Sequence, residues 1–407
     1  MVVRGITFRL DAPLPSEAGF LLQDFRVAVN EAIRAGLQSG VTSRYALTKQ
    51  VYRDLRTNHP GVYSKHLVSV FEVAAGILKN HRRRMHAGKA RRIPFVKRLM
   101  MKAENQAYIL DRKNGVIDLP VRAGLHVRLS LIVSQYHMKY LKDESLRLGS
   151  LTILSDRVII VFRKQTPKPF VPRSVLILDT NERSLDGVLT EAESTVPVVA
   201  SFPEVAAIQH RHHERRKMLG KKKAYDRRTS GMLCKREGTR EHNRVHSRLH
   251  LVADSILSFA ENERSAIVLE DLAGTRLKTY KVLNRRLSVW PRRKLHQIIE
   301  YKAAWRGIPV MKVDPRYSSR KCPICGRIQD SRMGAVFRCE CGWKLDRHIN
   351  ASLNLLQTAI SKGLEVAGGL RFNPGAFQHD VMMILYDPEK GARSEPNGTS
   401  CSRVVTH

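Results

Sequence analysis

Two acidic residues follow apolar runs that are typical of buried β-strands. Asp179 ends the run SVLILD, and Glu270 ends the run AIVLE. In open sheets, catalytic sites gather at the carboxyl ends of strands, where converging carboxylates can hold Mg²⁺ or Mn²⁺. A pair of such ions activates a water molecule and stabilises the leaving oxygen in phosphodiester cleavage. Each acid alone also has a purely structural interpretation, as a cap of the turn or helix that follows.

Four cysteines form two close pairs, each followed by glycine. Cys322 and Cys325 lie in CPICG, and Cys339 and Cys341 lie in CECG. Four thiolates predict a tetrahedral Zn²⁺ site, and because four sulfurs leave no open position, the zinc would be structural. Each glycine permits the positive φ that such knuckles use. The second pair has the spacing C-x-C, which predicts a tighter turn, and four free thiols are the alternative.

A strongly basic segment lies between Asp179 and Glu270 in the sequence. Positions 210–250 hold fourteen Lys and Arg residues against four acids. Solvated helix faces usually balance their charges, so this excess favours a surface that binds nucleic-acid phosphates over a merely solvated face. The candidate phosphate-binding residues are Arg211, Arg215, Arg216, Lys217, Lys221, Lys222, Lys223, Arg227 and Arg228.

The composition limits the class of protein. The 407 residues include 71 Lys+Arg and 37 Asp+Glu, and the net charge of +34 requires a polyanionic partner. A hydrophobic content of 43% excludes a wholly disordered chain. No apolar run approaches the roughly 18 residues that span a bilayer, and the start MVVRGITFRLDAPL lacks the apolar part of a signal peptide. Six cysteines are too few for a disulfide framework, so we expect a soluble protein in a reducing compartment.

The hydrophobic pattern predicts the elements that position these residues. Strand-like runs at 5–10 and 151–162 flank a segment, about 17–101, with apolar residues at helical spacing, which indicates a small β domain with a helical insert. A second domain is predicted to begin near residue 171. Its strands are predicted at 175–178, 185–190, 196–202, 265–271 and 308–314, and its helices at 249–260 and 290–305. Beyond residue 363 we expect a poorly ordered tail.

The stretch LSVWPRRKLHQIIEYKAAWRGIPVMKVDPRYSSRKCPICG, followed by FRCECGWKLDRHINASLNLL, resembles the TnpB proteins of insertion sequences and the related type V CRISPR effectors. With LILDTNERSLDGVL and AIVLEDLAGTR in order, the resemblance is close over about 171–360 and loose over 1–170. It implies a multidomain α/β protein, in which a RuvC-like nuclease domain of RNase H fold follows a β-barrel wedge domain. The implied parts are the wedge domain (1–15 and 104–170), its helical recognition insert (16–103), the nuclease domain (171–315 and 343–362), a zinc-binding target-nucleic-acid-binding module (316–342) and the tail (363–407).

The resemblance also assigns the catalytic acids. The first falls on Asp179, the second on Glu270, and the third lies in LDRHINASLN. Members that contain D-R-D-x-N-A offer two acids in this segment, whereas His348 stands here in place of the later one. Asp346 is therefore the predicted third ligand of Mg²⁺ or Mn²⁺, because a neutral imidazole suits Mg²⁺ poorly. Asp346 can also cap the helix that follows it, and this role is compatible with catalysis.

The resemblance implies an RNA-guided DNA endonuclease. We expect it to bind a guide RNA made from the end of its transposable element and to cleave matching double-stranded DNA beside a short flanking motif. One monomer per RNA is implied, in the cytoplasm of a prokaryotic cell and at its nucleoid. One alternative is a repressor whose nuclease is inactive because of His348, which the presence of Asp179 and Glu270 disfavours. The other is a transposase that acts without RNA, which the cysteine motif disfavours.

Overall fold

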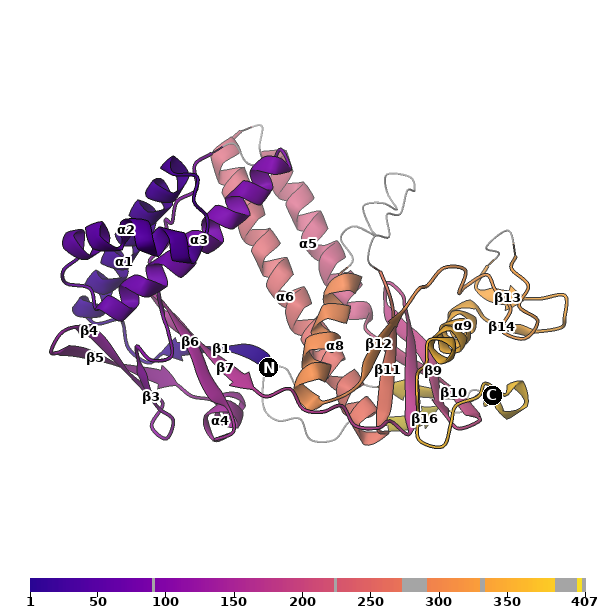
Figure 1. Cartoon of the computed structure of the whole chain (residues 1–407). Helices are drawn as coiled ribbons and strands as arrows, with labels where there is room; N and C mark the ends of the chain where they lie inside the picture. Colours follow the sequence, from indigo (N-terminus) through magenta and orange to yellow (C-terminus); the bar gives the residue numbers. More distant parts are fainter. Residues whose placement is uncertain (90–91, 223–224, 273–290, 330–333, 385–400, 405–407) are drawn as a thin grey trace. The chain divides into compact units, whose positions relative to one another are not determined.

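The chain folds into two compact units, Met1–Gln165 and Thr166–His407. The computed structural model describes residues 1–89, 92–222, 225–272, 291–329, 334–384 and 401–404 (Figure 1). Among the helices it describes, none combines the length and the apolar character needed to cross a membrane.

The first unit is built on a seven-stranded antiparallel sheet with the strand order β2-β6-β7-β1-β5-β4-β3. Three helices are inserted between β1 and β2 (Figure 1). The elements are β1 (Val2–Leu10), α1 (Ser16–Gln38), α2 (Arg44–Asn58), α3 (Ser64–His86), β2 (Met100–Ala103), β3 (Ile109–Asp111), β4 (Val116–Arg122), β5 (Leu125–Ile132), α4 (Gln135–Leu141), β6 (Arg147–Leu154) and β7 (Arg157–Lys164).

The insert is helical because its apolar residues recur at steps of three and four. In α3, Leu67, Val70, Phe71, Ala74 and Leu78 follow this spacing and are all buried. The helical insert predicted for residues 17–101 is thus confirmed over α1 to α3, whereas β2 already begins at Met100. In the strand order, β2 and β3 are the edges of an open sheet, so the barrel that the resemblance implies stays a prediction.

The second unit is built on a mixed sheet with the strand order β12-β11-β8-β9-β10-β15-β16. Strands β8, β11 and β12 are parallel to one another, and β8, β9 and β10 form antiparallel hairpins. The elements are β8 (Ser174–Thr180), β9 (Ser184–Glu191), β10 (Ser194–Ser201), α5 (Pro203–Lys221), α6 (Arg227–Asn262), β11 (Ser265–Glu270), α8 (Arg292–Arg306), β12 (Val310–Val313), β13 (Val336–Arg338), β14 (Lys344–Asp346), α9 (Arg347–Ser361), the 3₁₀ turn η2 (Pro374–Ala376), β15 (Val381–Ile384) and β16 (Cys401–Val404).

Helices cover both faces of this sheet, which explains why β8 reads as a continuous apolar run. Leu176 and Leu178 pack on one face with residues of α6 and α8. Val175 and Ile177 pack on the other face with residues of α9 (Figure 1). The strands predicted at 175–178, 185–190, 196–202, 265–271 and 308–314 are confirmed, as is the helix at 249–260.

The chain beyond residue 363 differs from the prediction of a poorly ordered tail. Strand β15 pairs in parallel with β10, with Met382 opposite Val198. Phe377 is buried, and Leu364 and Phe372 pack against the same core. Strand β15 has four residues, which is too few to show a clear alternation of apolar and polar residues, so the sequence pattern did not reveal it. Residues 385–400 and 405–407, which include the polar run near the end, lie outside the described residues.

Candidate functional site

Two of the predicted acids lie side by side. Leu178 of β8 and Leu269 of β11 are register partners in the parallel pair, so the next residues, Asp179 and Glu270, emerge at the same level. The two residues are only 8% and 9% exposed. The backbone N–H of Thr180 donates a hydrogen bond to Glu270 Oε2 at 3.2 Å. The strand register therefore brings the first two sequence-predicted acids together at the carboxyl ends of two buried strands.

This pair of carboxylates carries an electrostatic cost. Burial, together with the Asp179 carboxylate, raises the pKa of Glu270 to about 8. Two carboxylates with little access to water repel each other unless a proton or a cation lies between them. Oxygen donors of this kind are the preferred ligands of Mg²⁺ and Mn²⁺, so Asp179 and Glu270 fit the divalent cation that the sequence predicts.

Asp346 lies at the start of α9 as its N-cap. Its carboxylate accepts hydrogen bonds from the backbone N–H groups of His348 at 2.8 Å and Ile349 at 3.2 Å, and its side chain is exposed. Within the described part of the chain, only the four cysteines place three or more possible metal-ligand atoms all within 4.8 Å. The capping role of Asp346 is thus confirmed, but neither its carboxylate nor that of Asp186 completes a set of three with Asp179 and Glu270 at that spacing. Metal binding by Asp346 stays a prediction.

His348 reaches the acid pair from the first turn of α9. Its Nδ1 lies 2.8 Å from Asp179 Oδ2. This hydrogen bond raises the pKa of the half-buried imidazole, and Asp179, Asp186 and Asp346 add to the effect by their charge. A protonated His348 therefore supplies a positive charge directly beside the first predicted acid.

A third acid near this site was missed by sequence reasoning. Asp186 of β9 is the direct cross-strand partner of Asp179. The Asn181 side chain donates a hydrogen bond to its carboxylate. Burial raises the pKa of Asp186, and the Asp179 charge raises it further. The signal was available in the sequence, because a β8–β9 hairpin that turns between Thr180 and Leu185 places residues 179 and 186 opposite each other.

The four cysteines form the second candidate site. Their sulfurs all lie within 4.8 Å of one another, with Cys322 Sγ 3.6 Å from Cys341 Sγ and Cys325 Sγ 3.5 Å from Cys339 Sγ. A tetrahedral site with Zn–S bonds of about 2.3 Å has sulfur–sulfur edges of about 3.8 Å, which these separations approach. The cluster therefore fits a closed metal site of the structural type.

Each cysteine pair is shaped by its glycine. Gly326 and Gly342 have φ values of 75° and 91°, which confirms the positive φ predicted for both turns. Gly326 N–H donates to the carbonyl of Cys322, and Gly342 N–H donates to that of Cys339, both at 3.0 Å. A hydrogen bond from the backbone of Cys341 lowers the pKa of Cys339 to about 7, while burial raises the pKa of Cys322.

The cysteine cluster is attached to α9 by buried amide side chains. Asn354 Nδ2 donates to the carbonyls of Ser318 at 2.8 Å and Lys321 at 2.7 Å, and Asn350 Nδ2 donates to Lys321 at 3.0 Å. The indole N–H of Trp343 donates to Asn350 Oδ1 at 3.2 Å. The same helix therefore holds the loop before Cys322 and places His348 beside Asp179.

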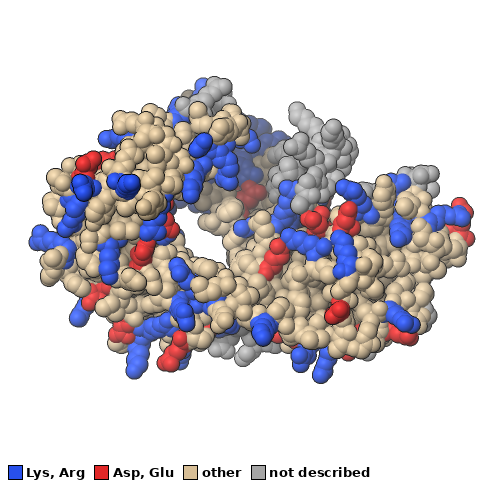
Figure 2. All heavy atoms as spheres, in the orientation of Figure 1, with Lys and Arg blue, Asp and Glu red and all other residues tan. Residues whose placement is uncertain are grey.

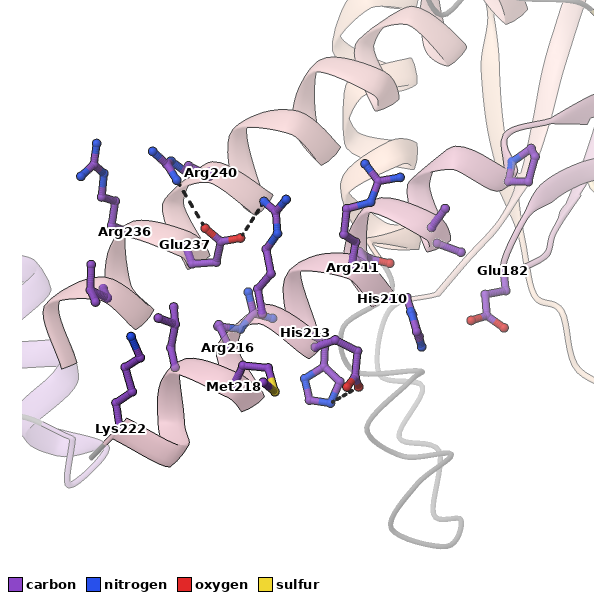
Figure 3. A pocket seen from close by; sticks show the side chains of 18 of the residues that line it. Glu182, His210, Arg211, His213, Arg216, Met218, Lys222, Arg236, Glu237 and Arg240 are labelled. Atoms are coloured by element: carbon purple, nitrogen blue, oxygen red, sulfur yellow. Dashed lines mark hydrogen bonds and ion pairs between the residues drawn. The ribbon is translucent and has the colours of Figure 1, made fainter. Parts of the chain in front are cut away.

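The basic segment forms a helical hairpin with a groove along it. Helices α5 and α6 pack against each other, and a groove of about 1640 Å³ is lined by residues of both and by Glu182 and Arg183 (Figure 3). This volume exceeds the roughly 300–1,000 Å³ of small-molecule sites and suits a polymer. The cationic residues that line it are Arg183, Arg211, Arg215, Arg216, Lys222, Arg236 and Arg240.

The predicted phosphate-binding residues are mostly exposed. Arg211, Arg215, Arg216 and Lys222 line the groove, as predicted for a binding surface. Four others are exposed but are not among the lining residues: Lys217, Lys221, Arg227 and Arg228. Lys223 lies outside the described residues. On the face that Figure 2 shows, Lys and Arg side chains are more abundant than Asp and Glu side chains.

Acids inside the hairpin also have a structural role that the sequence did not reveal. Glu237 is buried and accepts a hydrogen bond from His212, whose Nδ1 lies 2.7 Å away. The same carboxylate lies 3.4 Å from Arg215 and 3.7 Å from Arg240 (Figure 3). Glu241 pairs with Arg216. These acids hold α5 against α6 and orient arginines at the groove. His212 is therefore a packing residue of the hairpin.

Comparison with known proteins adds family evidence to this geometry. The family model for the Cas12f1-like TNB domain matches residues 293–355, which include α8, the cysteine cluster and the start of α9. The family described as uncharacterized protein MJ0013 matches residues 21–117. The TnpB-like protein MJ0751 of Methanocaldococcus jannaschii is 28% identical over 58% of this chain and 88% of its own length. The CRISPR-associated endodeoxyribonuclease Cas12f1 of Sulfoacidibacillus thermotolerans is 38% identical, but the match covers only 24% of this chain and 22% of that protein.

Solved structures agree at the level of the fold. The mini-RNA-guided endonuclease CRISPR-Cas_phi3 aligns over 89% of this chain and 93% of its own, with a TM-score of 0.54 and 10% identity. The chain is a mixed α/β protein of two units, with paired acids at the ends of parallel strands and a four-cysteine cluster between α8 and α9, and its likeness to this solved structure is one of fold. In sequence, the chain is similar to a TnpB-like protein over more than half of its length and to Cas12f1 over a shorter stretch.

Proposed function

We propose that this protein is an RNA-guided DNA endonuclease encoded by a transposable element. The observation that carries the proposal is the convergence of Asp179 and Glu270 at the ends of parallel strands in a chain that is similar to TnpB-like proteins. Guide RNA from the element end and matching double-stranded DNA would be its partners. In such a system base pairing reads the target sequence, while the protein reads a short flanking motif.

The nuclease domain would be RuvC-like and would use Mg²⁺ or Mn²⁺. Bound at the acids, two such ions supply an activated water and stabilise the leaving oxygen in phosphodiester hydrolysis. Asp179 and Glu270 would hold these ions, and the resemblance assigns the third acid to Asp346. The raised pKa of Glu270 supports this role, because a carboxyl with a costly buried charge gains from a nearby cation.

The α5–α6 hairpin would bind the phosphates of the guide RNA and of the RNA–DNA hybrid. Its groove carries seven cationic side chains against three acidic ones, which are Glu182, Glu214 and Glu237. Phosphate binding of this kind is independent of sequence, as an RNA-guided protein requires.

We assign residues 1–15 and 104–170 to a wedge domain, 16–103 to a recognition insert and 171–315 with 343–362 to the nuclease domain.

The four cysteines would hold a structural Zn²⁺. Residues 316–342 would then form a module that binds the target nucleic acid, anchored on α9 through Asn350 and Asn354. Zinc would contribute to folding of this module, because its four sulfur ligands come together only when the chain around them is folded.

A second candidate function is supported by a specific contact. His348 Nδ1 lies 2.8 Å from Asp179, where an imidazolium would neutralise the carboxylate in place of a metal ion. A chain that keeps this ion pair would bind guide-matched DNA without cutting it and would act as a repressor. The acid pair Asp179 and Glu270 favours the nuclease, because a binding protein has no need of two buried, mutually repelling carboxylates.

The test is cleavage of a plasmid library that carries the guide-matched target beside randomised flanks. The protein is co-expressed with the RNA of its element end, and the reaction contains either Mg²⁺ or EDTA. We expect cuts that require both RNA and Mg²⁺ and that disappear in Asp179→Ala. RNA-dependent binding of the target without any cut, in wild type and variant alike, would establish the repressor.

A further inference from the structure

Three acids form a row across the central strands of the second unit. Glu270 pairs with Val313 of β12, Asp179 follows the Leu178–Leu269 register pair, and Asp186 is the direct partner of Asp179. Directly paired residues of adjacent strands project to the same face of a sheet, with Cβ atoms about 5 Å apart. Glu270, Asp179 and Asp186 therefore project at one level from β11, β8 and β9.

The face on which this row lies is the one covered by α9. Ile177, Val188 and Val268 stand two residues before or after the three acids, so they share the same face. All three pack in the core cluster that contains Leu353 and Leu356 of α9. The row thus lies under the start of α9, where His348 contacts Asp179.

We propose that Asp186 is the third carboxylate of the nuclease site, in place of an acid on α9. This inference rests on the proposed function and names a ligand of the same site. Asp186 would move beside Asp179 by rotation of its own side chain away from Asn181 and Ser184, which both hydrogen-bond to it. The close approach of β8 and β9 fixes the pairing, because a Cβ on Gly187 would overlap the carbonyl oxygen of Ile177.

The geometry of Asp346 argues against the alternative. Its carboxylate already accepts two backbone N–H groups of α9 and is exposed. To join Asp179 and Glu270 it would have to leave these donors unpaired, which removes the N-cap of α9 and destabilises the helix. Its place above Asp179 is also occupied by His348, whose ring contacts Asp179 directly.

The test measures Mn²⁺ binding to the full-length chain by electron paramagnetic resonance. RNA is removed first, because its phosphates bind Mn²⁺ themselves. The variants are Asp179→Ala, Asp186→Asn, Asp186→Ser and Asp346→Asn. Asp226→Asn is the matched control, since Asp226 is the exposed N-cap of α6 and Asn caps a helix equally well. Asn at position 346 likewise keeps the cap and removes only the charge.

We expect Asp179→Ala to abolish the tightly bound Mn²⁺ and both Asp186 variants to weaken it about tenfold or more, whereas Asp346→Asn and the control leave it unchanged. The double variant Asp186→Asn with His348→Asp should restore binding, because it returns a carboxylate to the α9 side of the same site. Tryptophan emission on heating identifies any variant that fails to fold. If Asp186→Asn fails to fold, Asp186→Ser carries the test, alone and combined with His348→Asp.

The outcomes separate this inference from the proposed function. Loss of Mn²⁺ in Asp346→Asn with retention in the Asp186 variants would overturn the inference and leave the nuclease intact. Retention of bound Mn²⁺ in Asp346→Asn and in the Asp186 variants alike would also overturn the inference. Mn²⁺ binding that depends on Asp186, in a wild-type protein that does not cut with its RNA, would support the inference and reject the nuclease. If Mn²⁺ binding does not depend on Asp179, both the inference and the proposed function are rejected.

Discussion

Replacing Glu270 by Gln should stabilise the second unit at alkaline pH when divalent ions are absent. Burial and the Asp179 carboxylate raise the pKa of Glu270 from 4.5 to about 8. The folded protein therefore keeps a proton on Glu270 between these pH values, whereas the unfolded chain releases it. Stability contributed by this group is present below pH 4.5 and decreases as the pH rises to about 8. Gln is neutral at every pH, so the variant lacks this loss.

The size of the effect follows from the two pKa values. Raising the pKa from 4.5 to about 8 lowers the free energy of unfolding at high pH by at most about 5 kcal/mol, at about 1.4 kcal/mol for each pH unit. Side-chain movement and water entry relieve part of this cost, so we expect Glu270→Gln to gain roughly 2 kcal/mol at pH 9 and almost nothing at pH 4.5. The amide oxygen of Gln can keep the hydrogen bond from the Thr180 N–H.

The assay is urea unfolding in EDTA, followed by tryptophan fluorescence. All three tryptophans, Trp290, Trp305 and Trp343, belong to the second unit, so their emission reports this unit alone. Mg²⁺ at pH 8 should then stabilise wild type more than Glu270→Gln, because an ion binds the native site. The electrostatic reasoning would be refuted if Glu270→Gln were no more stable than wild type at pH 9. It would also be refuted if the difference in unfolding free energy between variant and wild type were equal at pH 4.5 and pH 9.

Three further predictions concern the other parts of the second unit. Cys339→Ser should reduce bound zinc from about one ion per chain to near zero, as measured by atomic emission, because three sulfurs no longer close the site. Arg211→Glu should weaken RNA binding and reduce the slope of log affinity against log salt by about one or more, whereas Glu214→Gln on the same helix should not weaken binding. Asn354→Ala should destabilise the second unit by about 1–3 kcal/mol in urea unfolding, since it removes the donor to the Ser318 carbonyl and leaves the Lys321 carbonyl with Asn350 as its remaining side-chain donor. Equal stability of this variant and wild type would show that water replaces those bonds.

The sequence predicted the features that depend on local pattern. Asp179 and Glu270 were found because each ends an apolar run, and the parallel pairing of β8 and β11 places such ends together. The cysteine cluster was found because its spacing and glycines define two tight turns. The strands and helices of the core were found from periods of two and 3.6 residues.

The features that the sequence did not predict depend on pairing across the fold. Asp186 becomes a neighbour of Asp179 only through the β8–β9 register, which a shift of one residue would change completely. Glu237 stands among basic residues in the sequence, yet its burial depends on which face of α6 meets α5. Strand β15 is too short to show a pattern and is stabilised by its pairing with β10.

The two acid arrangements differ in what holds them in place. Asp179 and Asp186 are fixed by hydrogen-bonded pairing within the sheet, and Glu270 follows from the neighbouring strand. Asp346 and His348 are carried by α9, which also anchors the loop before Cys322 through Asn350 and Asn354. A metal site that relied on Asp346 would therefore depend on the state of the cysteine cluster. A site that uses Asp186 has its three carboxylates on strands of one sheet, so movement of α9 changes the surroundings of the metal but not its ligands.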